Sequence, residues 1–505
     1  MPHRSIALAV AVAVTLVAGC SGIGDRQPTA EPAGAPVTNA TPKAPAPPSA
    51  AAPVDDDPVP PPLSWAPCHG DFECATLTVP IDYAEPRAGT IDLAVTRHPA
   101  DKQAERVASL IVNPGGPGGS GLDMVQNGFG ARRGLYDRLD VVSWDPRGVG
   151  ASAPLTCGAG AEAFLALDPG PDSPAEHAAL DAGAQGVAAD CAAHAGPLLD
   201  HMATDVTVRD LEQLRRAVGD DRLTYAGYSY GTAVGLAYAE RYPTRVRAMV
   251  LDGVVRTDQD LEQTLTDQAQ AIDLSLDNTL NRCASASNCP LDDAAGTYDR
   301  LAAQIEQTPL PAGGGTTLGP ADLAFAAIET TYDPSLEPTL WAALARAEAG
   351  DGSGLTRLAS RYRKTVPDYP SYAAVICVDF PHPVGADAYR AFADRLTARF
   401  PRVGAAIANE LLPCAYWPAP VVGRPHQPAA AGAPPTLVVG NIGDAATPFS
   451  SATWMADHLA RSVLLTYDGD GHTSGGRSSC IDEAVLRYLI DLTLPAEDTR
   501  CGAGS

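Results

Sequence analysis

The chain has 505 residues, 45% hydrophobic and 19% charged, which is enough for one large elaborated domain or two to three smaller units. Its formal net charge of −25 argues against nucleic acid as a partner, because a phosphate backbone needs a basic face. This acidity favours solubility and cationic ligands instead. The 47 glycines and 46 prolines predict many turns and at least one proline-rich segment.

The first twenty residues resemble an export signal. Arg4 is followed by an apolar run, residues 6–17, that is too short to span a bilayer comfortably. The tetrapeptide Val17-Ala18-Gly19-Cys20 resembles the lipobox of bacterial lipoproteins. It predicts removal of residues 1–19, lipidation of Cys20 and anchoring to the cell membrane or envelope, with some of the protein secreted. The alternative is ordinary secretion, in which Cys20 is coincidental.

Residues 20–62 are rich in alanine and proline and predict an extended tether, with the folded part beginning near Leu63. An even number of cysteines beyond Cys20, in an exported chain, predicts disulfides. The short spacings of Cys68 with Cys74 and of Cys283 with Cys289 suggest that these neighbours pair. No pair has the repeated C-x-x-C spacing of a zinc site, so no metal site is predicted. No other cofactor is expected.

The first predicted strands are residues 75–80 and 90–98, joined by a turn, and a third strand ends in the glycine cluster Asn113–Gly119. Backbone N–H groups in such a cluster are uncovered by side chains, and Gly115 or Gly116 is predicted to donate to an oxyanion. The alternative is a flexible loop. A further strand, 139–143, runs into Trp144–Ser152, where Asp145 and Arg147 are expected to form an ion pair.

A helix is expected from Val206 to Val218, with Thr204 and Asp205 as its capping pair. It is followed by LTYAGYSYGTAVG, in which Gly227 and Gly231 flank Ser229 at the spacing of a nucleophile elbow. Ser229 is the predicted nucleophile, and the backbone N–H of Tyr230, at the start of the next helix, is a second predicted oxyanion donor. Gly-x-Ser-x-Gly alone can also arise by chance in a glycine-rich chain.

After the elbow the pattern changes from strands to helices. Residues 246–253 are predicted to form a buried parallel strand, but helical segments dominate from 256 to 430 and predict a cap over the site. Strands 436–440 and 462–467 then return in the final part, 431–505. Together with residues 63–255 they predict an α/β-hydrolase fold: a doubly wound, mostly parallel sheet interrupted by a helical cap insertion.

Each late strand is followed by a loop with a catalytic candidate, Asp444 after the first and His472 after the second. With Ser229 they follow the serine, acid, histidine order of α/β hydrolases and predict the triad of an acyl-transfer enzyme. Asp470 is a rival acid, although its place two residues before His472 favours a role in shaping the loop. Thr447 is expected to hold the Asp444 loop by hydrogen bonding.

Together these motifs resemble a family, the secreted tripeptidyl aminopeptidases of actinobacteria, which are related to proline iminopeptidases. The resemblance spans residues 65–501 and includes lipid-anchored mycobacterial members that are also described as carboxylesterases. It rests on the glycine cluster, the elbow, the two late loops, residues 144–152 and the cap run AAVICVDF, residues 373–380. Proline iminopeptidases have a histidine opening the glycine cluster. Here Asn113-Pro114 stands there, which favours the tripeptidyl branch.

The resemblance implies a peptide or protein substrate with a free N-terminus. Recognition of a free ammonium requires buried carboxylates, and the cap offers Asp379, Glu410 and Glu329 as candidates. A bridge between Cys377 and Cys414 would hold the first two rigid. The alternative for each acid is a solvated or structural role.

Three other functions remain open at this point. An esterase or lipase would use the same triad but needs an apolar groove in the cap for its acyl chain. An aromatic content of only 6% does not suggest such an apolar cap. An endopeptidase of the cell envelope would not need the ammonium site. A lipid-anchored binding protein with an inactive hydrolase fold is disfavoured, because no predicted triad member is missing.

Overall fold

The computed structural model describes residues 57–129, 134–365 and 368–503. The predicted signal peptide, Cys20 and most of the tether lie outside these residues. Among the described residues, no helix combines the length and the apolar character needed to cross a bilayer.

A ten-stranded sheet forms the core of the fold, in the order β1-β2-β3-β5-β4-β6-β7-β10-β11-β12. The first three strands and β5 pair antiparallel, and every pair from β5 onward is parallel. The strand bounds are β1 Ala66–His69, β2 Phe72–Pro80, β3 Thr90–His98, β4 Ala108–Asn113, β5 Leu139–Trp144, β6 Leu223–Tyr228, β7 Val246–Asp252, β10 Thr436–Gly443, β11 Ser462–Asp470 and β12 Arg500–Gly502.

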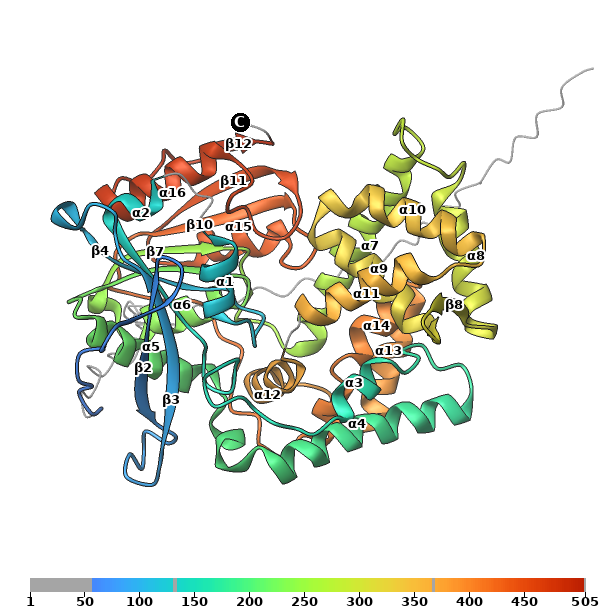
Figure 1. The fold of residues 1–505 in the computed structure, drawn as a ribbon, viewed down its shortest axis with the longest axis horizontal. Helices are drawn as coiled ribbons and strands as arrows, with labels where there is room; N and C mark the ends of the chain where they lie inside the picture. The colour runs from blue at the N-terminus through green and yellow to red at the C-terminus, as the bar shows by residue number, and fades with distance from the viewer. Residues whose placement is uncertain (1–56, 130–133, 366–367, 504–505) are drawn as a thin grey trace, which may run out of the picture. The chain divides into compact units, whose positions relative to one another are not determined.

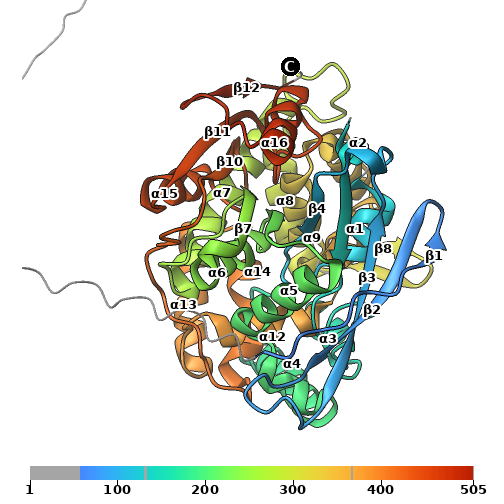
Figure 2. The same ribbon diagram turned by 90° about the vertical axis from the view of Figure 1, so that its left-hand side faces the viewer.

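Both faces of the sheet are covered, because its central strands are apolar on both sides. In β4 all six residues are buried, with Leu110 and Val112 in one core cluster and Ile111 in the other. Helices α1 and α16 contribute to the cluster that contains Leu110 and Val112. Helices α5, α6 and α15 contribute to the cluster that contains Ile111, and Figure 2 shows where these helices lie. The helix bounds are α1 Gly121–Asn127, α2 Leu135–Arg138, α5 Thr204–Val218, α6 Gly231–Arg241, α15 Phe449–His458 and α16 Ser479–Asp491. This alternation confirms the predicted doubly wound α/β architecture.

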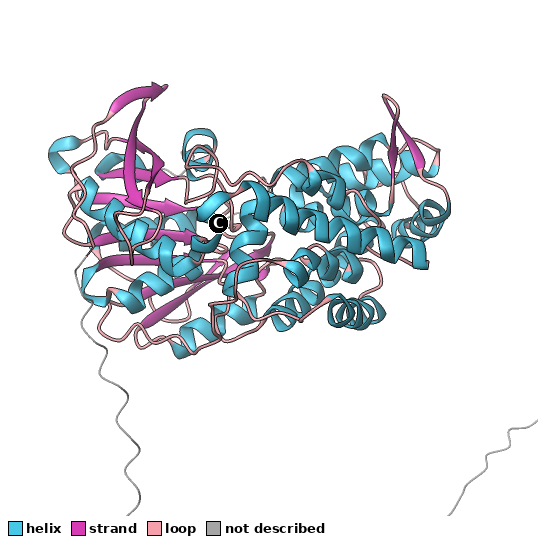
Figure 3. Cartoon of the chain, turned by 90° about the horizontal axis from the view of Figure 1, so that it is seen from below, coloured by secondary structure: helices cyan, strands magenta, loops and turns pink. Residues whose placement is uncertain are grey.

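The helices between β7 and β10 lie beyond the sheet, on the right of Figure 1. Figure 3 shows the strands of the large sheet on one side and these helices, with one two-stranded hairpin, on the other. Their bounds are α7 Leu261–Cys283, α8 Ala294–Gln307, α9 Pro320–Tyr332, α10 Glu337–Glu348, α11 Ser353–Thr365, α12 Tyr369–Asp379, α13 Ala386–Arg399 and α14 Gly404–Asn409, with a hairpin of β8 Leu310–Gly313 and β9 Thr316–Leu318.

Two helices that precede the elbow lie against these cap helices, although the sequence groups them with the core. They are α3 (Gly160–Leu165) and α4 (Pro174–His194). Arg390 of α13 forms an ion pair with Asp181 of α4 at 3.0 Å, and the Asn409 side chain donates to the Pro169 carbonyl at 2.8 Å. Part of the cap's packing surface therefore comes from the segment between β5 and β6.

Five disulfides close loops in the described residues, and they include the two neighbour pairs expected from spacing. The pairs are Cys68–Cys74, Cys157–Cys191, Cys283–Cys289, Cys377–Cys414 and Cys480–Cys501. Disulfides persist in oxidising compartments, so they indicate an extracytoplasmic location.

The expected pair between Asp145 and Arg147 is wrong. Arg147 is 1% exposed and binds Asp210 through Nε at 2.7 Å and Nη2 at 2.8 Å. Asp145 instead accepts from the Ser120 hydroxyl at 2.6 Å and the Ala151 N–H at 2.8 Å. Asp210 is on α5, 63 residues further along the chain. The expectation failed because it chose the partner of Arg147 by closeness in the sequence.

Candidate active site

Ser229 lies on a strained turn between β6 and α6. Its φ of 53° is in the left-handed region, which a residue with a side chain rarely adopts, and such strain is typical of functional sites. The turn is held from below, because the Ser229 N–H donates to the Asp252 carbonyl at 3.0 Å. Gly227 has no room for a side chain, since a Cβ there would lie 2.3 Å from the Gly231 carbonyl oxygen. The close packing directs the serine away from the sheet.

The glycine cluster packs directly against this turn. A Cβ on Gly115 would lie 2.6 Å from the Tyr230 nitrogen, so the two segments touch through their backbones. The Gly115 N–H donates to the Asn113 side-chain oxygen at 2.8 Å, which gives this predicted oxyanion donor another acceptor. Within the described part of the chain, no hydrogen bond is found from the N–H of Tyr230 or of Gly116. These two groups remain available to a developing negative charge.

His472 and Asp444 meet at the carboxyl ends of β11 and β10. His472 Nδ1 lies 3.0 Å from Asp444 Oδ1 and 3.1 Å from Oδ2. Thr447 supports the acid twice, through its N–H to Oδ1 at 2.8 Å and its hydroxyl to Oδ2 at 3.0 Å, and the Thr473 N–H donates to Oδ2 at 3.1 Å. A carboxylate in this position fixes the histidine tautomer and favours its protonated form.

The charge state of Asp444 follows from its surroundings. Burial alone raises the pKa of this carboxyl, but the neighbouring His472 and the backbone N–H donors of Thr447 and Thr473 outweigh it. The net effect holds the pKa below its usual value, so Asp444 is ionised at neutral pH.

The rival acid points elsewhere. Asp470 forms an ion pair with Arg282 of α7 at 3.1 Å and is about half exposed. A Cβ on Gly443 would lie 2.1 Å from its Oδ1, so Asp470 packs against the loop that leads to Asp444. Its position is consistent with a loop-shaping role.

No hydrogen bond joins Ser229 Oγ to His472 in the described residues, but the backbone keeps the two loops together. Gly253 follows Asp252, whose carbonyl accepts from the Ser229 N–H at 3.0 Å. A Cβ on Gly253 would lie 3.4 Å from His472 Cε1 and 3.0 Å from Thr447 Oγ1. Nucleophile and base are often loosely aligned without substrate, so this arrangement is compatible with catalysis.

The cap touches the histidine through the end of α9. The Tyr332 ring packs edge-on against the His472 ring, with centroids 5.3 Å apart, and the Tyr332 carbonyl accepts from the His472 N–H at 3.0 Å. Burial first, and then the charges of Glu410, Asp444 and Glu329, raise the pKa of Tyr332. The Tyr332 hydroxyl therefore lies within electrostatic reach of Asp444, the predicted triad acid, and of Glu410 and Glu329, two predicted ammonium ligands.

Asp379 already has partners within the protein. Its carboxylate accepts from the Tyr230 hydroxyl at 2.7 Å and from the Thr204 N–H at 3.0 Å. It therefore caps α5 from 175 residues away, and the expected capping by Thr204 and Asp205 is wrong, because α5 begins at Thr204 itself and Ala203 precedes it. These contacts tie α12 to the elbow and leave Asp379 little capacity for substrate.

Glu329 and Glu410 differ in their charge partners. Glu329 lies on α9 and forms an ion pair with Arg361 of α11 at 2.9 Å. Glu410 follows α14, is partly buried, and accepts from the Tyr362 hydroxyl at 3.1 and 3.3 Å. No ion pair of Glu410 is found in the described residues. Burial raises the pKa of its carboxyl to about 7.

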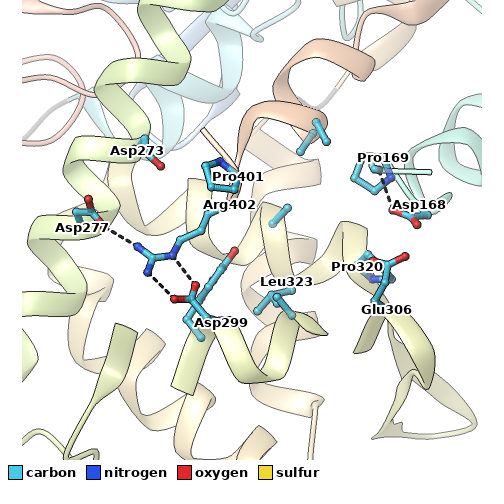
Figure 4. A pocket seen from close by; sticks show the side chains of 16 residues that line it. Asp168, Pro169, Asp273, Asp277, Asp299, Glu306, Pro320, Leu323, Pro401 and Arg402 are labelled. Atoms are coloured by element: carbon cyan, nitrogen blue, oxygen red, sulfur yellow. Dashed lines mark hydrogen bonds and ion pairs between the residues drawn. The ribbon is translucent and has the colours of Figure 1, made fainter. Parts of the chain in front are cut away.

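A separate cavity of about 640 Å³ lies among α7, α8, α9 and the turn before α14. Figure 4 shows Arg402 between Asp277 and Asp299, bound to Asp299 at 2.8 and 2.9 Å. Asp168 and Glu306 stand at its other end, where their oxygens and one of Glu176 lie within 4.8 Å of one another. None of the predicted catalytic or ammonium-binding residues lines this cavity.

Comparison with known proteins agrees with the topology. A family model described as "alpha/beta hydrolase fold" matches residues 108–302, and one described as "TAP-like protein" matches residues 399–501. The chain is 34% identical to serine protease Hip1 of Mycobacterium tuberculosis over 479 residues, covering 87% of this chain and 91% of the relative. The molecule is therefore a serine hydrolase of the α/β class.

Two further relatives show which family of α/β hydrolases the chain belongs to. Tripeptidyl aminopeptidase of Streptomyces lividans is 32% identical over 468 residues, covering 87% of this chain and 86% of its own. Carboxylesterase B of Mycobacterium tuberculosis is 35% identical over 452 residues, covering 85% and 86%. The chain belongs to the actinobacterial tripeptidyl aminopeptidase family, which includes the serine protease and carboxylesterase relatives.

Proposed function

We propose that this enzyme is a serine exopeptidase that removes short peptides from free N-termini. Ser229 is the nucleophile, His472 the general base and acid, and Asp444 the carboxylate that orients the imidazole. The tripeptidyl aminopeptidase relative supports the cleavage position. The observation that carries the proposal is Glu410, a cap carboxylate for which the described residues supply no ion-pair partner. It accepts from the Tyr362 hydroxyl at 3.1 Å, and the Tyr362 ring lies 6.4 Å from the ring of Tyr332, which packs on His472.

The chemistry proceeds through an acyl-enzyme. His472 takes the Ser229 hydroxyl proton as the oxygen attacks the scissile carbonyl, and the N–H groups of Tyr230 and Gly116 bind the oxyanion. The imidazolium then gives its proton to the departing amine. A water molecule, deprotonated by the same imidazole, releases the N-terminal peptide as a carboxylic acid and restores the serine hydroxyl.

Substrate selection follows from the charge of Glu410. An ionised carboxylate in a partly dry site is costly unless a cation joins it, and a peptide N-terminus supplies that cation. Glu329 contributes negative potential from the neighbouring α9, although Arg361 already offsets part of its charge. We leave Asp379 out of this site, because the Tyr230 hydroxyl and the Thr204 N–H occupy its oxygens.

A substrate panel tests the proposal. It contains mono-, di- and tripeptide fluorogenic amides, each with a free and an acetylated N-terminus, and a short-chain nitrophenyl ester. We expect kcat/KM to be highest for free tripeptides. The carboxylesterase relative supplies the competing hypothesis, an enzyme for acyl esters, which ester hydrolysis far faster than every peptide would favour.

We also propose that the mature protein begins at lipidated Cys20 and partitions with membranes. A diacylglyceryl group on the Cys20 sulfur, attached by a thioether, and an acyl chain on its amino group, attached by an amide, together bury enough methylene groups for stable anchoring. Mass spectrometry of the N-terminal peptide from the membrane fraction is expected to show the acylated cysteine. An unmodified peptide starting elsewhere between residues 18 and 27 would instead indicate ordinary secretion.

The raised pKa of Glu410 predicts a pH-dependent stability. The carboxyl has a folded-state pKa of about 7 against an ordinary 4.5, so its contribution is complete below pH 4.5 and is lost as pH rises through 7. The loss is roughly 3 kcal/mol. Glu410→Gln keeps an acceptor for Tyr362 but cannot ionise. We expect the variant to unfold at a higher denaturant midpoint than the wild type at pH 8, with the advantage shrinking towards pH 5. An advantage that does not change with pH would contradict the assignment.

A further inference from the structure

The last residue of β7 links the serine and histidine loops. The Asp252 carbonyl accepts from the Ser229 N–H at 3.0 Å, directly beneath the elbow. Its carboxylate accepts from the Ser474 N–H at 3.0 and 3.1 Å, the Ser474 hydroxyl at 2.9 Å and the Gly475 N–H at 3.1 Å. Asp252 is 3% exposed, so these bonds lie in a dry environment, where charge-assisted hydrogen bonds are strong.

The histidine loop needs such support because its backbone is strained. Thr473, which follows His472, has a φ of 59°, a left-handed conformation that is unfavourable for a β-branched residue. The Thr473 N–H is bound by Asp444 at 3.1 Å, and the next two N–H groups are bound by Asp252. Two carboxylates, at the ends of the adjacent strands β10 and β7, thus hold three successive N–H groups of the loop.

We infer that Asp252 is a positioning residue that sets the placement of His472 relative to Ser229. The inference rests on the proposed roles of those two residues. Asp252 holds the serine turn through its backbone and the histidine loop through its side chain, so a shift in one loop is opposed by the other. No hydrogen bond or ion pair between Asp252 and His472 is found in the described structure. Asp252 therefore acts on the position of His472 through its bonds to Ser474 and Gly475.

Asp252→Asn is the direct test, because it keeps the shape of the side chain. The amide retains one acceptor, but its NH₂ group faces N–H donors and cannot bind them. The histidine loop should relax, and a misplacement of about 1 Å can lower a rate roughly 100-fold. The readout is the rate of covalent labelling by a fluorophosphonate, in which Ser229 Oγ displaces fluoride from phosphorus while His472 takes the hydroxyl proton. We expect labelling and kcat to fall about 10- to 100-fold, with KM for a tripeptide amide little changed.

Two further variants separate positioning from general stability. Ser474→Ala removes only the 2.9 Å hydroxyl bond and should slow labelling by a smaller factor, so it remains informative if Asp252→Asn does not fold. Asp140→Asn is the matched control. Asp140 is a buried strand carboxylate on β5 that accepts from the Ala100 N–H at 2.8 Å, and its loss should lower the melting temperature without slowing labelling.

The outcomes are distinguishable. Wild-type labelling on Ser229 together with wild-type rates for both Asp252→Asn and Ser474→Ala would overturn the positioning role. Wild-type protein that is not labelled on Ser229 would overturn the proposed function itself. Slow labelling of Asp252→Asn and Ser474→Ala, with normal labelling of Asp140→Asn, would support the inference.

Discussion

Replacing Ser229, His472 or Asp444 with alanine is expected to lower kcat by about 10⁴- to 10⁶-fold, with the smallest loss at Asp444. The serine supplies the bond-forming oxygen, the histidine moves the proton, and the acid orients the ring through Nδ1 at 3.0 Å. Because the three groups act as a unit, a double variant should lose little more than its worse single variant. Steady-state kinetics on a tripeptide amide, with circular dichroism to check folding, provides the measurement.

Asp470→Ala is the control for the acid. Asp470 pairs with Arg282 at 3.1 Å on a half-exposed surface, so we expect most of the activity to remain. Near-full activity of Asp444→Ala together with loss in Asp470→Ala would show that the acid is misassigned.

Glu410→Gln is expected to abolish most of the preference for a free N-terminus. Burial raises the pKa of Glu410 to about 7, so the carboxyl is fully ionised only when a cation pairs with it. Acetylation removes that cation, and the blocked peptide loses a partly buried charge pair worth about 2–5 kcal/mol. Free tripeptides should then exceed acetylated ones in kcat/KM by about thirty-fold or more. The glutamine variant has no charge with which to bind a free ammonium, and it has no charge pair to lose when the N-terminus is acetylated. The kcat/KM values of the free and acetylated substrates should therefore become similar.

Two variants test whether the effect is specific to Glu410. Glu329→Gln should reduce the preference less, because Arg361 already pairs with Glu329 at 2.9 Å. Asp379→Asn should leave the ratio of free to acetylated turnover unchanged, although the weaker contacts to Tyr230 and Thr204 will lower stability. An unchanged ratio in Glu410→Gln, with a collapsed ratio in either of the others, would move the ammonium site to that residue.

The sequence predicted the fold class because its signals are local. Buried apolar strands such as residues 246–253 and the glycines around Ser229 depend on neighbours within a few residues. Asp444 and His472 could be chosen because each directly follows a strand, and parallel strands end at one edge of a sheet. The two short disulfide pairs were equally local.

The remaining features depend on contacts distant in the sequence. Nothing near Arg147 indicates Asp210, and nothing near Thr204 indicates that Asp379 caps its helix. Asp252 went unnoticed because the pattern LDG shows only a strand end, whereas its partners lie 222 and 223 residues further on. The three cap acids could be ranked as ammonium ligands only once their partners were known. The sequence shows a carboxylate, but it does not show whether an arginine or the N–H groups of a helix already bind it.

Digestion of one unlabelled peptide of about ten residues tests the central claim most directly. The peptide is supplied with a free and with an acetylated N-terminus, and mass spectrometry follows the products over time. We predict that wild-type enzyme releases the N-terminal tripeptide from the free form first, and that both the blocked peptide and the Ser229→Ala enzyme give almost no product. Internal cleavage, or equal cleavage of the free and blocked peptides, would contradict the account.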